Sequence, residues 1–285
     1  MLCYRYMKFR DAKWSLEDGW FKTARPSELN DPFDCRLNFV GKPTDAVLWD
    51  YVNRDFPLIK ARAIRVNPSL AKINIGRPFI YEKLRAECGW AEKFTKMMYA
   101  QHDETQRLIC FSTAACKDEC GDNLMWGHYA ENGAGIRVGF DIDEHQLEKM
   151  CTFRHVDYKK EMPKVDLAKL KIWPADAENS WDTFIKCLFT KDCSWRYEDE
   201  VRLVILKEES CDPPVFQERF IDGKRLDFVR FPYEAIRTVD FGVRADETAV
   251  AKLVEELRGN PSARHIVFRK AALRNDVYGY AYVLI

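Results

Sequence analysis

The sequence predicts an α+β fold with a mixed or antiparallel central β-sheet. Segments whose apolar residues alternate as in strands occur at both ends and in the middle of the 285-residue chain. Amphipathic helices lie between them, and one long stretch is helical throughout. No internal repeat and no Gly/Ser-rich linker divides the sequence, so a single domain over residues 1–285 is expected.

The N-terminal elements are short. Leu2 to Met7 has the aromatic and apolar content of a strand, Trp14 to Gly19 predicts a helix that ends at glycine, and Trp20 to Thr23 predicts a second strand. The Asn30-Asp31-Pro32-Phe33 segment favours a turn, because Asn and Asp side chains bond nearby backbone and proline fixes its own φ angle.

An α-helical insertion is expected after these strands, at about residues 43–105. Thr44 can cap a helix that runs to about Phe56, and Pro78 can open a longer helix from Phe79 to Met98. Beyond it, strands and helices alternate to the end of the chain. The expected strands are Leu108 to Thr113 and residues 136–140, 201–205, 238–243, 266–268 and 278–285, and the expected helices are residues 123–130, 180–190 and 250–257.

Charge and composition limit the partners and the location. Lys plus Arg and Asp plus Glu both number 45, so no global attraction to nucleic acid or to an acidic membrane is expected. The charged N-terminus lacks the apolar run of a signal peptide, and no long apolar stretch follows, which predicts a cytoplasmic protein without a membrane span. In the cytoplasm the ten cysteines are expected to be free thiols.

The strongest candidate site is a pair of glutamates near residue 200. Side chains alternate along a strand, so Glu198, Glu200 and Arg202 are expected on one face, with Val201 and Leu203 on the other. Because unpaired carboxylates are too costly to bury, the glutamate face is expected to be exposed or to form the wall of a cleft. The alternative is a solvated edge on which Arg202 neutralises one glutamate.

Three further candidates are less specific. Ser112 and Thr113 end a predicted strand, where hydroxyl groups usually bond local backbone. Arg5 lies between two tyrosines and is expected on the opposite face from them, where it could hold a phosphate or carboxylate or form an ordinary ion pair. His128, followed by Tyr129, could act as a general base, although a lone histidine is more often structural.

Several common cofactor motifs are missing from the sequence. It has no paired Cys-x-x-Cys and no His-Glu-x-x-His, so no metal site is predicted. It also lacks G-x-G-x-x-G and the P-loop pattern, which argues against a Rossmann or P-loop nucleotide site.

With these segments identified, the chain resembles the bacterial family of domain of unknown function 2971 (DUF2971). The matching segments are Tyr4-Arg5-Tyr6, Pro26 through Asn30-Asp31-Pro32-Phe33, Cys110-Phe111-Ser112, Met125-Trp126-Gly127-His128-Tyr129-Ala130 with the following Gly135 to Asp141, and Trp195 to Arg202. They are distributed over most of the chain outside the helical insertion. The family name implies no activity.

A more distant resemblance is to ADP-ribosyltransferases of the R-S-E type. It rests on an arginine in the first strand, a Ser-Thr step in a central strand and Glu-x-Glu at the start of a later strand, although Ala114 replaces the usual third serine. The resemblance implies an ADP-ribosyltransferase-like fold and a transfer of ADP-ribose from NAD to an unknown macromolecular acceptor, protein or nucleic acid. A bacterial toxin or defence effector would fit this activity.

The same resemblance implies roles for individual residues. Glu200 would bond the ribose 2′-OH and stabilise the oxocarbenium ion, and Glu198 would orient or deprotonate the acceptor. The residues implied to contact NAD are Arg5, Ser112, Thr113, Tyr129 and His128. This assignment requires that Arg5, Ser112 and Glu200 line one cleft, and that Glu200→Gln abolishes NAD turnover with little change in melting temperature.

Two other classes of function remain open on the sequence. A metal-dependent nuclease or phosphodiesterase could use Glu198, Glu200, Asp31 and His128, since hard cations prefer carboxylate oxygens. A non-catalytic sensor or partner-binding protein would instead use the tryptophan-containing segments only as core.

Overall fold

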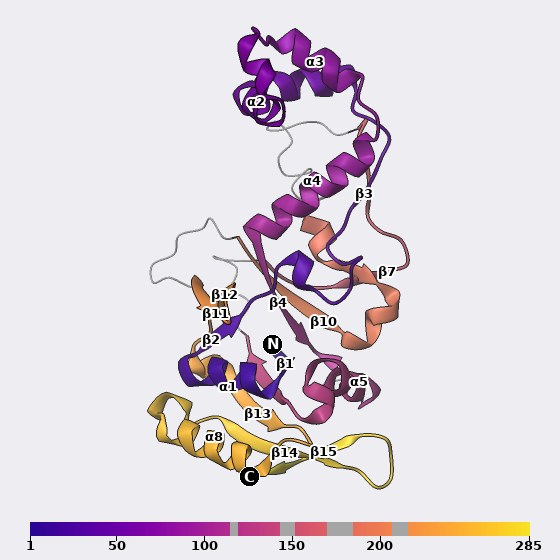
Figure 1. Ribbon diagram of the computed structural model, residues 1–285. Coiled ribbons are helices and arrows are strands. Elements are labelled where there is room, and N and C mark those ends of the chain that lie inside the picture. The colour runs from indigo at the N-terminus through magenta and orange to yellow at the C-terminus, as the bar shows by residue number, and fades with distance from the viewer. Residues whose placement is uncertain (115–118, 143–151, 170–184, 207–215) are drawn as a thin grey trace. The chain divides into compact units, whose positions relative to one another are not determined.

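The structure is a computed structural model that describes residues 1–114, 119–142, 152–169, 185–206 and 216–285 (Figure 1). The chain forms two compact units. Unit 1 comprises Met1–Pro32, His102–Lys160 and Lys191–Ile285, and unit 2 comprises Phe33–Gln101 and Glu161–Thr190. The predicted helical insertion therefore falls almost entirely in unit 2. No helix within the described ranges combines the length and apolar character that crossing a bilayer requires.

The helices and strands of the described residues are as follows. The α-helices are α1 (Phe9–Asp18), α2 (Asp45–Val66), α3 (Arg77–Arg85), α4 (Trp90–Thr105), α5 (Glu119–Tyr129) and α8 (Glu247–Gly259). The strands are β1 (Leu2–Met7), β2 (Trp20–Lys22), β3 (Asn38–Val40), β4 (Gln106–Ser112), β5 (Ile136–Asp141), β6 (Thr152–His155), β7 (Asp157–Lys159), β8 (Lys164–Asp166), β9 (Thr190–Asp192), β10 (Glu200–Leu206), β11 (Phe216–Ile221), β12 (Lys224–Arg230), β13 (Ile236–Phe241), β14 (Val267–Leu273) and β15 (Tyr280–Leu284).

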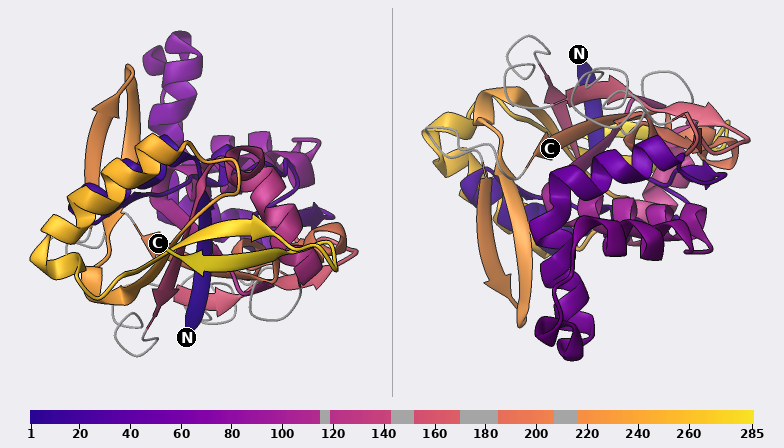
Figure 2. Two further views of the ribbon diagram at one scale, coloured as in Figure 1. Left: turned by 90° about the horizontal axis from the view of Figure 1, so that it is seen from below. Right: turned by 90° about the horizontal axis from the view of Figure 1, so that it is seen from above.

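Unit 1 is built on a large mixed sheet, which confirms the predicted α+β class. Eight of the described strands form it, in the order β15-β14-β13-β5-β1-β4-β10-β6. Every neighbouring pair is antiparallel except β13 and β14, which run parallel and are connected by α8 (Figure 2). A separate sheet, β11-β12-β2, also belongs to this unit.

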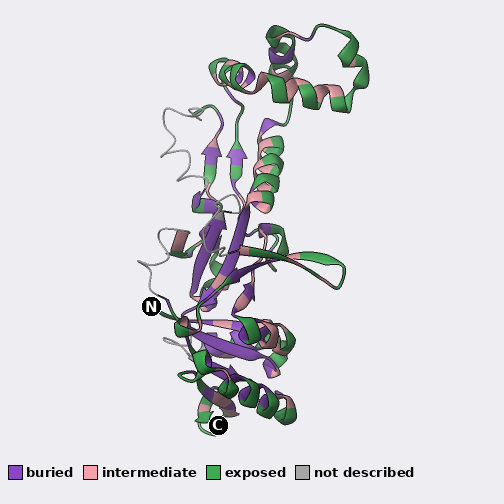
Figure 3. Cartoon of the chain, turned by 90° about the vertical axis from the view of Figure 1, so that its left-hand side faces the viewer, coloured by how far each residue is buried: buried purple, intermediate pink, exposed green. Residues whose placement is uncertain are grey.

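The two faces of the large sheet differ in chemistry. One face carries the apolar core, where Phe111, Val138 and Leu203 pack with residues of α1 and α8. Figure 3 shows these central strands as buried. The other face carries polar and aromatic side chains, because the register sets Tyr4 opposite Ser112 and Ser112 opposite Glu200. The helix α5 packs on this polar face.

The helices of unit 2 differ from the prediction at one point. The single helix expected from Phe79 to Met98 is two helices, α3 and α4, and Gly89 precedes the second with φ of 72°. That backbone conformation is open to glycine and ends the regular pattern. The earlier helix, α2, continues beyond Phe56 through Pro57, with non-helical angles at Asp55. Strands β3 and β8 form a short parallel pair in the same unit.

The described cysteines agree with the expectation of thiols. The six that the structure describes are Cys3, Cys35, Cys88, Cys110, Cys187 and Cys193, and none of these six forms a disulfide. Part of the helix predicted over residues 180–190 lies outside the described residues.

Candidate functional site

The glutamate pair does not lie on one continuous strand as predicted. Glu198 ends a 3-10 helix, Cys193–Glu198, and β10 starts only at Glu200. Between them Asp199 adopts a left-handed conformation (φ 42°, ψ 57°), which breaks the alternation on which the prediction depended. The two carboxylates nevertheless meet on one side of the sheet, because both bind the same lysine.

That lysine is Lys191, in β9. Its Nζ donates to Glu198 Oε2 at 2.5 Å and to Glu200 Oε2 at 3.1 Å. Arg202 adds a bidentate pair with Glu200, from Nε to Oε1 at 2.8 Å and from Nη2 to Oε2 at 3.1 Å. Two cations and two carboxylates thus form one compact, formally neutral cluster.

The cluster is buried, so the glutamates form neither the exposed face nor the solvated edge considered in the sequence, although Arg202 does neutralise Glu200 as the alternative expected. Glu198 and Glu200 are each 3% exposed and Arg202 is 0% exposed. An exposed face was expected because unpaired carboxylates are costly to bury, whereas these two form ion pairs with Lys191 and Arg202. Burial of charge is tolerated when ion pairs and hydrogen bonds satisfy it in this way.

The environment moves the two carboxyl pKa values in opposite directions. Burial raises the pKa of Glu198, and the neighbouring Glu200 raises it further against the opposing effect of Lys191. Burial also acts to raise the pKa of Glu200, but Arg202 and then Lys191 outweigh it and lower this pKa to about 2. At neutral pH Glu200 is therefore a fixed anion, while Glu198 is the carboxyl that more readily takes up a proton.

This difference predicts an acid-dependent loss of stability. A carboxyl whose pKa is lowered on folding stabilises the protein above its unfolded pKa of about 4.3, and that contribution disappears as the pH falls toward the folded value. We expect the difference in free energy of unfolding between wild type and Glu200→Gln to shrink between about pH 4.3 and pH 2. Urea denaturation at a series of pH values measures it. A constant difference over that range would contradict the assigned charge state of Glu200.

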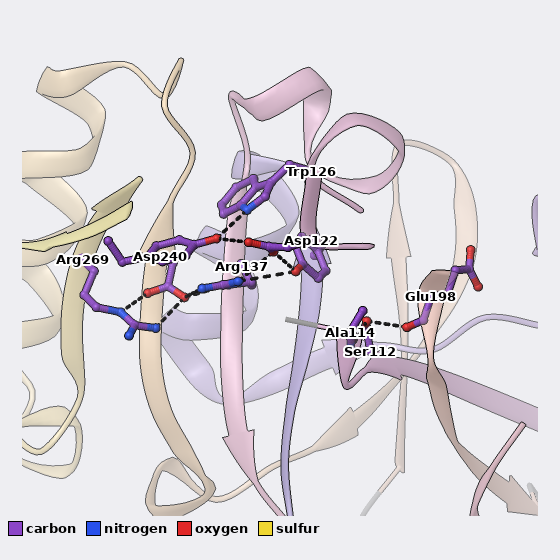
Figure 4. Close-up of polar contacts among 10 residues, drawn as sticks. Ser112, Ala114, Asp122, Trp126, Arg137, Glu198, Asp240 and Arg269 are labelled. Carbon is purple, nitrogen blue, oxygen red and sulfur yellow. Dashed lines mark hydrogen bonds and ion pairs between the residues drawn. The ribbon is translucent and has the colours of Figure 1, made fainter. Parts of the chain in front are cut away.

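Ser112 and Thr113 support the turn that carries Glu198. The Ser112 hydroxyl donates to the Glu198 backbone carbonyl at 2.5 Å and accepts from the Ala114 amide at 3.1 Å. Thr113 Oγ1 donates to the side chain and backbone of Asp199. Figure 4 shows the Glu198 carboxylate directed away from Ser112. Both hydroxyls therefore donate to backbone of the Glu198–Asp199 segment, which is distant in the chain, and only the bond from the Ala114 amide is the local backbone contact expected as the alternative.

The cluster reaches the surface through Tyr129, at the end of α5. The Tyr129 hydroxyl donates to Glu198 Oε1 at 2.5 Å and accepts from the exposed Asn30 amide at 2.8 Å. His128 is exposed beside it, with ring centroids 6.2 Å from Tyr129 and 5.9 Å from Tyr197. The predicted turn at Asn30, the α5 segment and the glutamate segment thus meet at one place.

Two more aromatic contacts extend this edge. The rings of Trp195 and Tyr197 lie 6.1 Å apart, and Lys191 Nζ lies 5.0 Å from the Trp195 ring centroid. Trp195, Tyr197 and Tyr129 are partly exposed. Together with His128 they form an aromatic edge beside the buried carboxylates, and such an edge suits a flat ring in a ligand.

Arg5 does not join this group. Strand alternation places it on the apolar face of the sheet, whereas Ser112 and Glu200 lie on the polar face. Its Nη2 donates to the Lys22 backbone carbonyl at 2.5 Å, its Nη1 is buried without a partner, and burial lowers its pKa to about 10. A cleft lined by Arg5, Ser112 and Glu200 is therefore not formed. The first-strand residue beside Ser112 is Tyr4.

Sequence reasoning also missed a second buried polar cluster on the same face. Arg137 donates to Asp240 and to Asp122, each at 2.8 Å, and its guanidinium stacks 4.5 Å from the Tyr4 ring and 4.0 Å from the Tyr282 ring. Asp122 is on α5, so the cluster anchors the helix that carries Tyr129 (Figure 4). No motif marks these residues, since they come from separate elements.

The sequence also contained no indication that Lys191 binds both glutamates. It lies only seven residues before Glu198, but its side chain reaches the cluster from a different strand, and no sequence pattern signals this. Within the described part of the chain, no three His, Cys, Asp or Glu side chains are grouped so as to hold a metal ion. The nuclease alternative, which needs Glu198, Glu200, Asp31 and His128 around a cation, gains no support from this arrangement.

Comparison with known proteins finds a family match over part of the chain but no activity. The model of the family "Protein of unknown function (DUF2971)" matches residues 125–203, which supports the resemblance to this family noted in the sequence. The matched segment includes Tyr129, Lys191, Glu198 and Glu200. No curated protein and no solved structure matches the chain.

Proposed function

From the geometry of the glutamate pair alone, and without the cleft of Arg5, Ser112 and Glu200 that the R-S-E resemblance required, we propose that the chain is an ADP-ribosyltransferase-like enzyme that cleaves the nicotinamide–ribose bond of NAD. The observation that supports this is the pair itself: Glu198 and Glu200 share Lys191, yet their pKa values move apart. Two carboxyl groups with opposite shifts can divide acid–base and electrostatic work between them.

The proposed roles of the two glutamates follow those that the resemblance to ADP-ribosyltransferases implied, whereas the role implied for Arg5 is dropped. Glu200 keeps a permanent negative charge, because Arg202 and Lys191 hold it ionised. This charge stabilises the positive charge that develops on the ribose ring as nicotinamide leaves. Glu198, which contacts the partly exposed Tyr129, receives the proton of the acceptor. Arg5 has no role in this proposal.

The chemical step balances without an additional reactant. The bond between ribose C1′ and the nicotinamide nitrogen breaks, and its electron pair leaves with nicotinamide, whose ring charge is thereby neutralised. The acceptor then bonds C1′ and transfers its proton to Glu198. For this to occur the substrate must replace the Tyr129 hydroxyl at Glu198 Oε1, which is the outermost contact of the cluster.

Nicotinamide release from NAD tests this proposal. Purified wild-type chain incubated with NAD should produce free nicotinamide, detected by chromatography. Tyr129→Phe should not lower the rate, since it removes only the hydroxyl that the substrate must displace from Glu198 Oε1. Glu234→Gln, at an exposed site on the 3-10 turn Tyr233–Ala235, should leave the rate unchanged. A wild-type chain that neither binds NAD nor releases nicotinamide would reject the transferase assignment.

A further inference from the structure

The helical part of unit 2 carries a strong local excess of positive charge. Residues 58–85 contain seven Lys or Arg residues and one acidic residue, Glu82, although the whole chain is neutral. These residues form the second half of α2, the 3-10 helix Pro68–Lys72 and α3. A local excess of this kind attracts polyanions even when the net charge of the chain is zero.

Most of these cations are exposed and unneutralised. Arg85 pairs with Asp45 and Glu82 at 3.5 and 3.9 Å. The other six form no ion pair with a carboxylate among the described residues, and we call them the basic helical surface: Lys60, Arg62, Arg65, Lys72, Arg77 and Lys83. All but Lys60 are exposed. Their charges are thus available to a ligand.

Aromatic rings lie among the cations. Phe79 is 40% exposed, and Lys83, one turn later on α3, places its Nζ 5.8 Å from the ring centroid. Arg77 stacks over Phe56 at 4.8 Å. An exposed ring beside a cation can stack on a base while the cation binds the neighbouring phosphate, and this combination is typical of single-strand binding.

An acidic membrane is the other polyanion that a basic helical surface could bind. Membrane-binding helices place a continuous apolar face opposite their charged face. Here the most exposed apolar side chains do not share one helix: Leu58 and Val66 are in α2, Ile73 follows the 3-10 helix and Phe79 is in α3, with cations between them in the sequence. The arrangement therefore favours phosphates of a nucleic-acid strand.

We infer that the basic helical surface of unit 2 binds single-stranded nucleic acid, with Arg62, Arg65 and Lys83 contacting phosphates and Phe79 stacking on a base. This inference does not depend on the activity proposed for unit 1, and no residue of the glutamate cluster takes part in it.

Fluorescence anisotropy of the full chain with a labelled single-stranded homopolymer, either RNA or DNA, tests the inference. The double variant Arg62→Glu with Arg65→Glu should weaken binding at least about tenfold. The plot of log K against log salt should also become less steep, by about 0.7 for each phosphate that the variant no longer binds. Phe79→Ala should weaken binding by about tenfold without changing that slope. Both changes are at exposed positions, so the circular dichroism spectrum should be retained.

A matched control separates a specific surface from general charge. Lys252→Glu with Arg230→Glu makes the same charge change at exposed positions of unit 1 and should leave binding nearly intact. Equal weakening in both double variants, or no binding by wild type at low salt, would overturn the inference. Binding only to phosphatidylserine vesicles, abolished in the unit 2 variant, would overturn it in favour of a membrane.

Discussion

Glu200→Gln should destabilise the protein strongly, by about 3–5 kcal/mol, because it leaves a buried cation without its counter-charge. Glu200 is bonded by both Lys191 and Arg202, and all three side chains are almost wholly buried. At this chain length the loss corresponds to a fall in melting temperature of roughly 10 °C, which differential scanning calorimetry measures. The sequence alone predicted an unchanged melting temperature, on the assumption of an exposed carboxylate.

Two variants make this result specific. Glu234→Gln changes the same functional group at an exposed site and should not shift the melting temperature. Replacing Arg202 by Met together with Glu200→Gln removes a charge of each sign and should restore part of the loss. A Glu200→Gln protein that melts like wild type would show that the ion pairs in this cluster contribute little.

Glu198→Gln should affect activity more than stability. The raised pKa of Glu198 brings its carboxyl nearer to the neutral state that Gln mimics, and Lys191 keeps its pair with Glu200. If Glu198 accepts the proton of the acceptor, its loss should lower the rate of ADP-ribosyl transfer by about 10²- to 10⁴-fold. Single-turnover measurements of nicotinamide release and product formation would show which step is affected.

The pH profile provides a second readout. A general base is active when ionised, so transfer should increase as the pH rises through the pKa of Glu198, and burial places this limb at higher pH than for an ordinary glutamate. Asp199→Asn, next to Glu198 in the chain, removes a charge without removing this base and should retain the limb. Full transfer activity in a folded Glu198→Gln protein would exclude Glu198 as the base.

Much of the sheet could be predicted from the sequence, because period-two alternation follows directly from strand geometry. Strand β5 and its partner β1 show this clearly, and the spacing of Val250, Leu253 and Val254 located α8. The hairpin of β11 and β12 was missed although a signal existed. Asp222 and Gly223 both have positive φ there, and an Asp-Gly step is a strong marker of a tight hairpin turn.

The candidate site was harder to predict, for a physical reason. The position of Glu198 depends on the left-handed Asp199, and its charge state depends on Lys191 from another strand. Neither follows from local propensity, since both result from tertiary contacts. Arg5 shows the opposite case: alternation correctly separated it from its tyrosine neighbours, and that same rule separates it from Ser112.

The stacked Arg137 has a consequence for how the molecule opens. Through Asp240 it joins β5 to β13, through Asp122 it holds α5, and through the ring of Tyr282 it reaches β15 at the edge of the sheet. An edge strand ordinarily frays by itself. Separating β15 from the sheet, however, would uncover the buried Arg137 guanidinium and the two carboxylates that it binds. The last hairpin and the helix that bears Tyr129 should therefore unfold as one cooperative block.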